Sequence, residues 1–139
     1  MASKLFLDAN VLFDLSLERE GYTHARQIVE AAIAGHINLF TSSSIIHILG
    51  HWLTKASGPS QARKLVLSLL EDVYVLETNH ESTVAALHSK INDIEDAIQY
   101  QTDIYHQLDL FISSRDKLLK KMSSHVLPIY TPEELLKTL

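Results

Sequence analysis

The sequence predicts an α/β protein of three layers, with a mostly parallel, five-stranded central sheet between two layers of helices. Short apolar runs alternate with segments of helical periodicity, which is typical of parallel sheets. Two of these runs, 4–7 and 110–113, are apolar on both faces, as expected of strands covered by helices on both sides. We therefore expect residues 1–139 to form a single domain, with the first strand central and flanked by the second and fourth.

Strands are predicted where short apolar runs end at polar or turn-forming residues. The first run stops at a polar turn, 8–10, and the third is rich in β-branched residues. The five expected strands are 4–7, 37–40, 73–76, 110–113 and 126–130.

Helices are predicted where apolar residues recur every three or four positions. Gly35 ends one helix, residues 41–44 offer N-caps for another, and Asn92 or Asp93 caps the longest. Pro132 stands in the first turn of the last helix. One helix is expected to begin at Val11, and another to run from a cap within residues 41–44 to about residue 55. The other expected helices cover 23–34, 61–70, 81–89, 93–108 and 133–139.

The composition excludes several kinds of chemistry. The chain has no cysteine, which rules out disulfides, thiolate catalysis and cysteine-based zinc sites. Twelve basic residues against seventeen acidic ones give a formal charge of −5, the opposite of the balance usual in duplex-binding proteins. A protein of this charge that handles nucleic acid needs a metal, a local basic patch or a basic partner. No apolar run is long enough to span a membrane and the first residues do not resemble a signal peptide, so we expect a cytoplasmic location.

Carboxylates from three segments are predicted to meet at one edge of the sheet. Asp8 directly follows the first strand and Asp116 follows the fourth. Asp93, Glu95 and Asp96 fall in the first turn of the helix that precedes the fourth strand, and this turn lies at the same edge. The carboxyl edge of a parallel sheet is where such proteins bind ligands.

A divalent cation would offset the repulsion between these acids. Mg2+ or Mn2+ prefers oxygen ligands and can activate water for displacement at phosphorus. Each acid also has a structural interpretation: Asp8 and Asp93 as helix N-caps, Asp96 as an acid that complements the helix dipole, and Asp116 as a turn residue. Asp109 precedes its strand and is expected at the opposite edge.

Four segments resemble the motifs of PIN domains, in the family's order. Residues 5–12, a hydrophobic strand followed by Asp-Ala-Asn-Val-Leu, closely resemble the opening of the family. Residues 93–100 look like the third motif of the branch that reads Asp-Phe-Glu-Asp-Ala-x-Gln-Tyr. Residues 111–116 resemble the fourth motif, and residues 127–134 the usual ending.

The resemblance implies a three-layer fold and a Mg2+- or Mn2+-dependent ribonuclease. It implies that Asp8, Asp96 and Asp116 are the metal-binding, catalytic acids, with Asn10 and Ser114 as polar companions. Small bacterial PIN domains are often VapC-type toxins that pair with an antitoxin protein and form homodimers. RNA, an antitoxin and a second copy of the chain are therefore the expected partners.

The sequence departs from the family at the second acid, usually a glutamate in the helix after the second strand. Residues 37–70 contain no acid, and His47 stands about where the glutamate would fall. A neutral imidazole can bind a metal without contributing negative charge, and His47 is equally compatible with a partly buried helix position. The cluster of Lys117, Lys120 and Lys121 is expected either to meet substrate phosphates or to form a solvated face.

Three functions remain open on the sequence. The first is a metal-dependent ribonuclease of the PIN kind, possible toxin of a toxin–antitoxin pair. The second is a non-catalytic PIN-like module that binds nucleic acid or protein, which the missing second acid favours. The third is a phosphatase similar to the haloacid dehalogenases, which the Asn10 in place of a second aspartate argues against.

Overall fold

A computed structural model describes residues 2–114, 121 and 123–139. Its sheet has five strands in the order β3-β2-β1-β4-β5, and every neighbouring pair is parallel. This confirms the expected sheet, with the first strand at the centre between the second and the fourth. The strands are β1 (Ser3–Leu7), β2 (Ile37–Ser42), β3 (Val73–Leu76), β4 (Leu110–Ile112) and β5 (Ile129–Tyr130).

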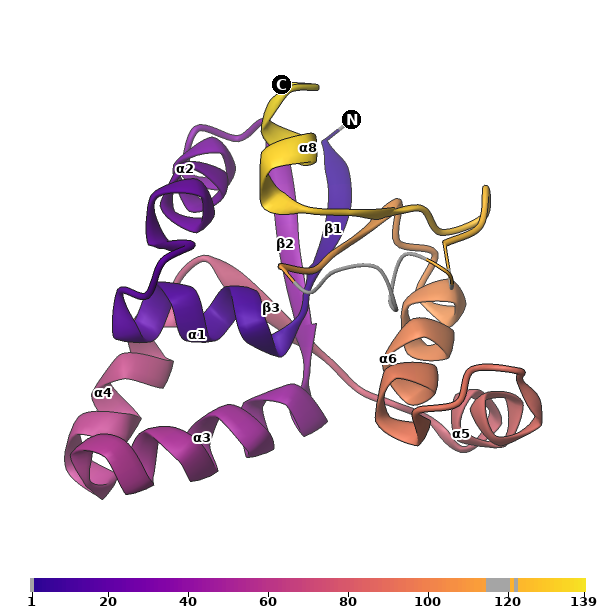
Figure 1. Ribbon diagram of the computed structural model, residues 1–139, viewed down its shortest axis with the longest axis horizontal. Helices are drawn as coiled ribbons and strands as arrows, with labels where there is room; N and C mark the ends of the chain where they lie inside the picture. Colours follow the sequence, from indigo (N-terminus) through magenta and orange to yellow (C-terminus); the bar gives the residue numbers. More distant parts are fainter. Residues whose placement is uncertain (1, 115–120, 122) are drawn as a thin grey trace.

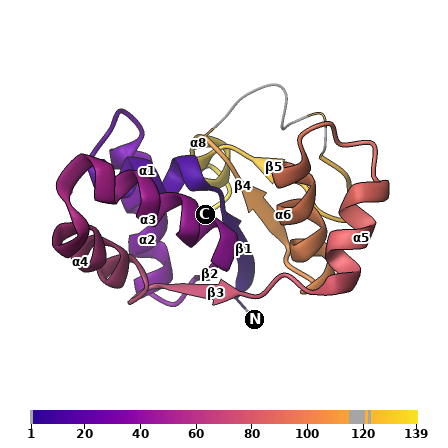
Figure 2. The same ribbon diagram turned by 90° about the horizontal axis from the view of Figure 1, so that it is seen from below.

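Helices lie on both sides of the sheet (Figures 1 and 2). One group gathers α1 to α4 and α8, while α5 and α6 pack against each other on the side of β4. The predicted three-layer arrangement is therefore confirmed. In chain order the described helices are α1 (Ala9–Leu17), α2 (Tyr22–Ile33), α3 (Ser43–Ser57), α4 (Pro59–Leu69), α5 (His80–His88), α6 (Ile94–Tyr105) and α8 (Pro132–Leu136).

Two expected boundaries are wrong in ways that affect the site. Residues 8–10 are not a turn: Asp8 is the N-cap of α1, which begins at Ala9 because the Asp8 side chain accepts a hydrogen bond from its backbone N–H. The helix expected over 93–108 is shorter, because Gln107 adopts a positive φ of 58° just after it ends.

Two further boundaries differ at the end of the chain. The fifth strand covers two residues rather than the predicted five; Pro128, which precedes it, has no N–H to donate to a ladder, although its carbonyl accepts from Phe111. The closing helix ends at Leu136 rather than Leu139. Neither change alters the order of the strands.

The core is centred on β1. Leu5, Phe6 and Leu7 are fully buried, as expected of a central strand covered on both faces. The Phe6 ring lies 5.0 Å from the ring of Phe111 on β4, and Tyr100 of α6 packs 6.1 Å from Phe111. These aromatic contacts pack α6 against β1 and β4, and so position the first turn of α6 near the carboxyl ends of these strands.

Asp109 lies at the opposite end of β1 from Asp8, as predicted. Its carboxylate accepts a hydrogen bond of 2.7 Å from the backbone N–H of Lys4, near the start of the strand. Asp109 thus has a structural role at the amino edge. In the described part of the chain, no helix combines the length and the apolar character that crossing a membrane requires.

A capping box starts α8 and provides a measurable contribution to stability. The Thr131 hydroxyl accepts from the Glu134 N–H, and the Glu134 side chain accepts from the Thr131 N–H. We expect Thr131→Ala to lower the free energy of unfolding by about 1 kcal/mol. Urea denaturation checks this, with Thr54→Ala as the control, because the Thr54 hydroxyl only donates to the Gly50 carbonyl within α3. An equal loss in both variants would contradict a capping effect.

Candidate active site

Asp8 occupies the carboxyl end of the central strand and is nearly buried, with 3% of its surface exposed. One carboxylate oxygen accepts from the Ala9 N–H at 2.8 Å and the other from the Ser113 hydroxyl at 3.0 Å. The register explains the second bond: Phe6 pairs with Phe111, so the side chains two residues further along, Asp8 and Ser113, leave the sheet on the same face. The side chain of Asp8 is therefore held in one orientation.

The first turn of α6 is fixed by Asp93. Its carboxylate accepts from the Asp96 N–H at 2.9 Å, which makes Asp93 the N-cap of the helix. This is the structural interpretation that its spacing allowed. Asp96 itself is half-buried, in the first turn of a helix that packs against α5.

Gln99 connects α6 to the carboxyl end of β2. Its side chain is buried, its carbonyl oxygen accepts from the Ser42 hydroxyl, and its amide group donates to the Ser44 hydroxyl. Ser42 also caps α3, so a single amide ties the ends of β2, α3 and α6 together. This bridge holds the first turns of α3 and α6 in position near the site.

Asp103 is the most unusual group in this region. It is fully buried on α6, and in the described part of the chain neither of its carboxylate oxygens has a hydrogen-bond partner. Burial, and to a lesser extent the negative charge of Asp8, raise the pKa of the Asp103 carboxyl well above its usual value. The two acids are therefore electrostatically coupled across the α6–sheet contact.

The predicted companions occupy different places around Asp8. Asn10 is half-buried on α1, and its carbonyl accepts from the Arg19 guanidinium at 3.3 Å. Ser114 is exposed and lines a cavity of about 790 Å³ together with Arg19 and His24. Because Ser114 lines it, this cavity is next to the fourth motif. Its lining carries both signs of charge, since Arg19 pairs there with Asp14 at 3.0 Å.

His47 lies on a helix but is not partly buried there, contrary to what its position between two isoleucines suggested. It is exposed on α3 and lines a groove of about 840 Å³ between α3 and α4, together with His51 and Arg63. Lys121 is exposed in a turn. Asp116, Lys117 and Lys120 lie outside the described residues, so the expected clustering of Asp8, Asp96 and Asp116 stays a prediction.

The donor set around Asp8 is compatible with a hard divalent cation. Its functional atoms are carboxylate and hydroxyl oxygens, the ligands that Mg2+ and Mn2+ prefer. No group of three histidine, aspartate or glutamate side chains that could hold a metal occurs within residues 2–114, 121 and 123–139. The part of the site that the structure describes therefore supplies fitting oxygen donors, and a complete ligand set would need Asp116.

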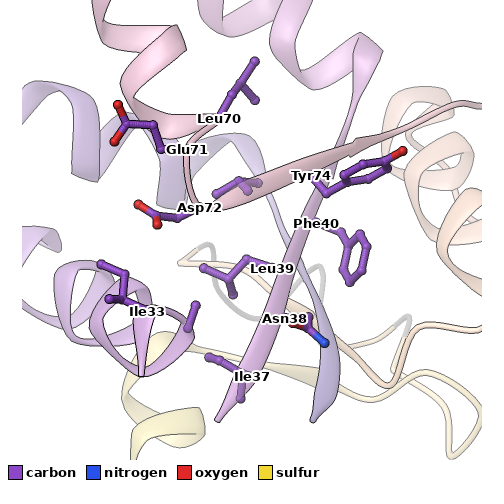
Figure 3. Close-up of a pocket in the computed structure, with 11 residues that line it drawn as sticks. Ile33, Ile37, Asn38, Leu39, Phe40, Leu70, Glu71, Asp72 and Tyr74 are labelled. Carbon is purple, nitrogen blue, oxygen red and sulfur yellow. The ribbon is translucent and has the colours of Figure 1, made fainter. Parts of the chain in front are cut away.

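A third cavity, of about 600 Å³, lies at the amino edge of the sheet (Figure 3). It is formed around the beginnings of β2 and β3 and the end of α2, with Ile33, Ile37 and Leu39 among its lining residues. Glu71 and Asp72 stand at its side, as the close-up shows. Because parallel sheets bind ligands at the carboxyl ends of their strands, this cavity is not the candidate site.

Three residues of the site were missed in the sequence: Ser113, Gln99 and Asp103. The signal for the last two is their spacing, since they stand three and seven positions after Asp96 and so share one face of α6. For Ser113 the signal is strand alternation, which places Ser113 and Ser114 on opposite sides of the chain.

Comparison with known families identifies the chain. The family model described as the PIN domain matches residues 4–117. The protein belongs to the PIN domain family, as its motifs indicated. Among curated proteins, none matches the sequence.

Solved structures show the same fold at low sequence identity. VapBC2 of Rickettsia felis, bound to a DNA fragment from its promoter, superposes with a TM-score of 0.72 at 12% identity, over 92% of this chain and 98% of that one. A toxin–antitoxin complex from Klebsiella pneumoniae superposes with a TM-score of 0.68 at 22% identity, over 94% of this chain and 98% of that one. VapC20 of Mycobacterium tuberculosis, described as a Sarcin–Ricin loop cleaving toxin, superposes with a TM-score of 0.60 at 12% identity, over 77% of this chain and 86% of that one. The described architecture is thus that of VapC-type PIN domains.

The raised pKa of Asp103 predicts an unusual dependence of stability on pH. Its carboxyl holds its proton more tightly in the folded state than in the unfolded chain, whose aspartates titrate near pH 3.9. Stability from this group is therefore complete below about pH 3.9 and is lost as pH rises through the folded-state pKa. In metal-free buffer, we expect Asp103→Asn to be increasingly more stable than native protein as pH rises towards neutrality. Thermal unfolding in EDTA across this range checks it; parallel curves would contradict the shift.

Proposed function

We propose that this PIN domain is a divalent-metal-dependent endoribonuclease, the toxin of a toxin–antitoxin pair. The observation that carries the proposal is Asp8: a nearly buried carboxylate, oriented by Ser113 at the carboxyl end of the central strand of a PIN fold. Asp8 also caps α1, but a cap needs no negative charge, because asparagine and serine cap equally well. The charge of Asp8 is the feature that supports metal binding, the role that the PIN motif implies for it.

Each acid has a distinct part in the proposal. Asp8, Asp96 and Asp116 hold Mg2+ or Mn2+, and Ser113 keeps the Asp8 carboxylate turned towards the site through its hydroxyl. Bound there, the cation would lower the pKa of a coordinated water and offset the charge of an RNA phosphodiester. Asn10 and Ser114 contribute polar groups beside these acids. Lys117, Lys120 and Lys121 are proposed to contact neighbouring phosphates.

The direct test is RNA cleavage as a function of Mn2+ concentration for native, Asp96→Asn and His47→Ala proteins. Native protein should cleave RNA only with the metal, and Asp96→Asn should fall to background. His47→Ala should cleave like native protein, because His47 is exposed in the groove between α3 and α4. Absence of cleavage by native protein would exclude the ribonuclease, and cleavage that does not need the metal would exclude the metal-dependent mechanism.

The second candidate is a PIN module that binds RNA or protein without cleaving it. It is favoured by the lack of an acid in residues 37–70, where the family carries its second one. This module would bind RNA equally well with and without Mn2+, and Asp96→Asn would not weaken the binding. Filter binding in EDTA and in Mn2+ therefore separates the two candidates.

The proposed partners are an antitoxin protein and a second copy of the chain. The structures with the same fold from Rickettsia felis and Klebsiella pneumoniae contain toxin–antitoxin assemblies, which supports the first. Co-expression with the product of an adjacent small reading frame, followed by size-exclusion chromatography with light scattering, tests both. A monomer that captures no such product would remove this part of the proposal.

A further inference from the structure

The hairpin of α3 and α4, residues 43–69, is basic in an otherwise acidic chain. It contains Lys55, Arg63 and Lys64, which are three of the twelve basic residues, and none of the seventeen acidic ones. The rest of the chain therefore carries all of the negative charge. Because a surface without acids does not repel a polyanion, and basic side chains attract one, the hairpin is suited to meet phosphates.

The groove of about 840 Å³ between α3 and α4 combines this charge with apolar surface. Lys55 of α3 and Arg63 of α4 are among its lining residues, and both are exposed. Ile46, Val66 and Leu67 line it as well, and Leu67 is 66% exposed. Cations beside apolar side chains can bind the phosphates and the flat faces of the bases of one strand together.

Trp52 is exposed at the side of this groove. Its ring lies 5.3 Å from the amino group of Lys55 and 5.4 Å from the ring of His51, and both of these residues line the groove. Trp52 nevertheless keeps 54% of its surface exposed. An exposed aromatic ring next to cations is the usual platform on which proteins stack a base of a single strand.

Gly50 lies in the middle of α3 and lines the same groove. Glycine inside a helix is less favourable than alanine. Among the described residues, a Cβ at Gly50 would meet nothing within 4 Å beyond its own stretch of helix, so packing within the chain does not require a glycine. Close approach of an occupant of the groove to the backbone of α3 would explain it.

Helix α3 leads from the candidate site to this groove. It begins where Gln99 bonds to Ser42 and Ser44, at the carboxyl end of β2. Figure 1 shows α3 running away from that end of the sheet with α4 beside it. From Ser44 to Lys55 the helix rises by roughly 16 Å. A stacked strand covers this distance with about five nucleotides, at ~3.4 Å each.

We propose that the groove between α3 and α4 binds single-stranded RNA that extends from the candidate site. Lys55 and Arg63 contact its phosphates, and Trp52 stacks on one of its bases. This inference rests on the proposed function, because it assigns the path of the RNA on the ribonuclease. A helix of an acidic protein would also suit an apolar groove with basic edges. The exposed indole and the continuity with the site favour RNA.

The test is the binding of a labelled single-stranded RNA of mixed sequence, measured by fluorescence anisotropy in EDTA at several salt concentrations. Lys55→Gln and Arg63→Gln should each weaken binding roughly threefold to tenfold and lower the salt slope by about 0.7. Lys90→Gln is the matched control and should bind like native protein, because Lys90 is an exposed lysine just after α5, on the side of β4.

The stacking contact is tested separately by Trp52→Ala. It should weaken binding by roughly fivefold or more and leave the salt slope unchanged, because the indole carries no charge. The aromatic control is Tyr105→Ala, since Tyr105 is 59% exposed at the end of α6. It should bind RNA like native protein.

Gly50→Leu tests the groove without removing a contact. Its side chain should occupy the groove and weaken RNA binding. Its Tm should equal or exceed that of native protein, because leucine favours a helix more than glycine does and the space beside Gly50 is open among the described residues. The Tm thus shows that the variant is folded.

The outcomes separate the inference from the function. Native RNA binding in Lys55→Gln, Arg63→Gln and Trp52→Ala would overturn the inference, and Mn2+-dependent cleavage by native protein would still support the ribonuclease. If these variants bind RNA normally but no longer retain the product of the adjacent reading frame, the groove is a protein interface and the inference is wrong. RNA binding that depends on the hairpin, without cleavage by native protein, would support the inference for a binding module and exclude the ribonuclease.

Discussion

Asp8→Asn is expected to remove Mn2+-dependent RNA cleavage while the protein stays folded. Loss of one ligand should lower the cleavage rate roughly thousandfold, since a bound metal contributes several kcal/mol to such a transition state and each 1.4 kcal/mol is a factor of ten. Asparagine is as good an N-cap as aspartate, so the bond to the Ala9 N–H that starts α1 is retained. Cleavage is measured at saturating Mn2+, and circular dichroism reports the fold.

The control for this substitution is Asp109→Asn, which removes the same charge at the other edge of the sheet. It should cleave RNA at the native rate. Asp8→Ala is informative as well, because it should lose both the cleavage and the cap, and so be less stable than Asp8→Asn by about 1 kcal/mol. Native cleavage by Asp8→Asn would show that Asp8 only caps α1.

Phe111→Ala should have the largest effect on stability. The Phe111 ring is fully buried on β4 and packs against Phe6 of the central strand and Tyr100 of α6. Its truncation should lower the free energy of unfolding by about 3–5 kcal/mol, through lost burial and the cavity left behind. This is a large share of the roughly 5–15 kcal/mol typical of a small domain.

Urea denaturation measures this loss, as a lower midpoint with an unchanged slope. Tyr105→Ala is the control, because Tyr105 is an aromatic residue at the end of α6 that is 59% exposed. It should change the free energy of unfolding by no more than about 0.5 kcal/mol. A similar loss in both variants would mean that the aromatic contacts beneath the site contribute little.

Strand order and the position of Asp8 could be predicted because both depend on local patterns. Apolarity on both faces of residues 4–7 indicates a central strand, and an acid directly after a parallel strand must lie at its carboxyl end. Asp93 is similar, since a cap depends only on the backbone N–H groups that follow within three residues. Such features require no knowledge of what lies across the sheet.

The boundaries that were wrong depend on weaker local signals. The expected turn over residues 8–10 is wrong, and the alternative interpretation of Asp8 as an N-cap is confirmed; a polar residue after a strand fits a turn and an N-cap equally well. The expected five-residue strand before Tyr130 contracts to two, since the extent of an edge strand depends on its neighbour, and β4 has only three residues. These differences leave the predicted topology unchanged.

The amino-acid sequence alone thus specified the family, the parallel sheet and the first acid of the site. The side chains that surround that acid could be identified only in the tertiary structure. Whether Ser113 or Ser114 bonds to Asp8 depends on the register between β1 and β4, and whether Asp103 is solvated or buried depends on which face of α6 meets the sheet. The first is set by a contact between residues 105 positions apart, and the second by contacts such as those of Gln99 with Ser42 and Ser44, which are 57 and 55 positions away. A local pattern of hydrophobicity carries no information on such pairings.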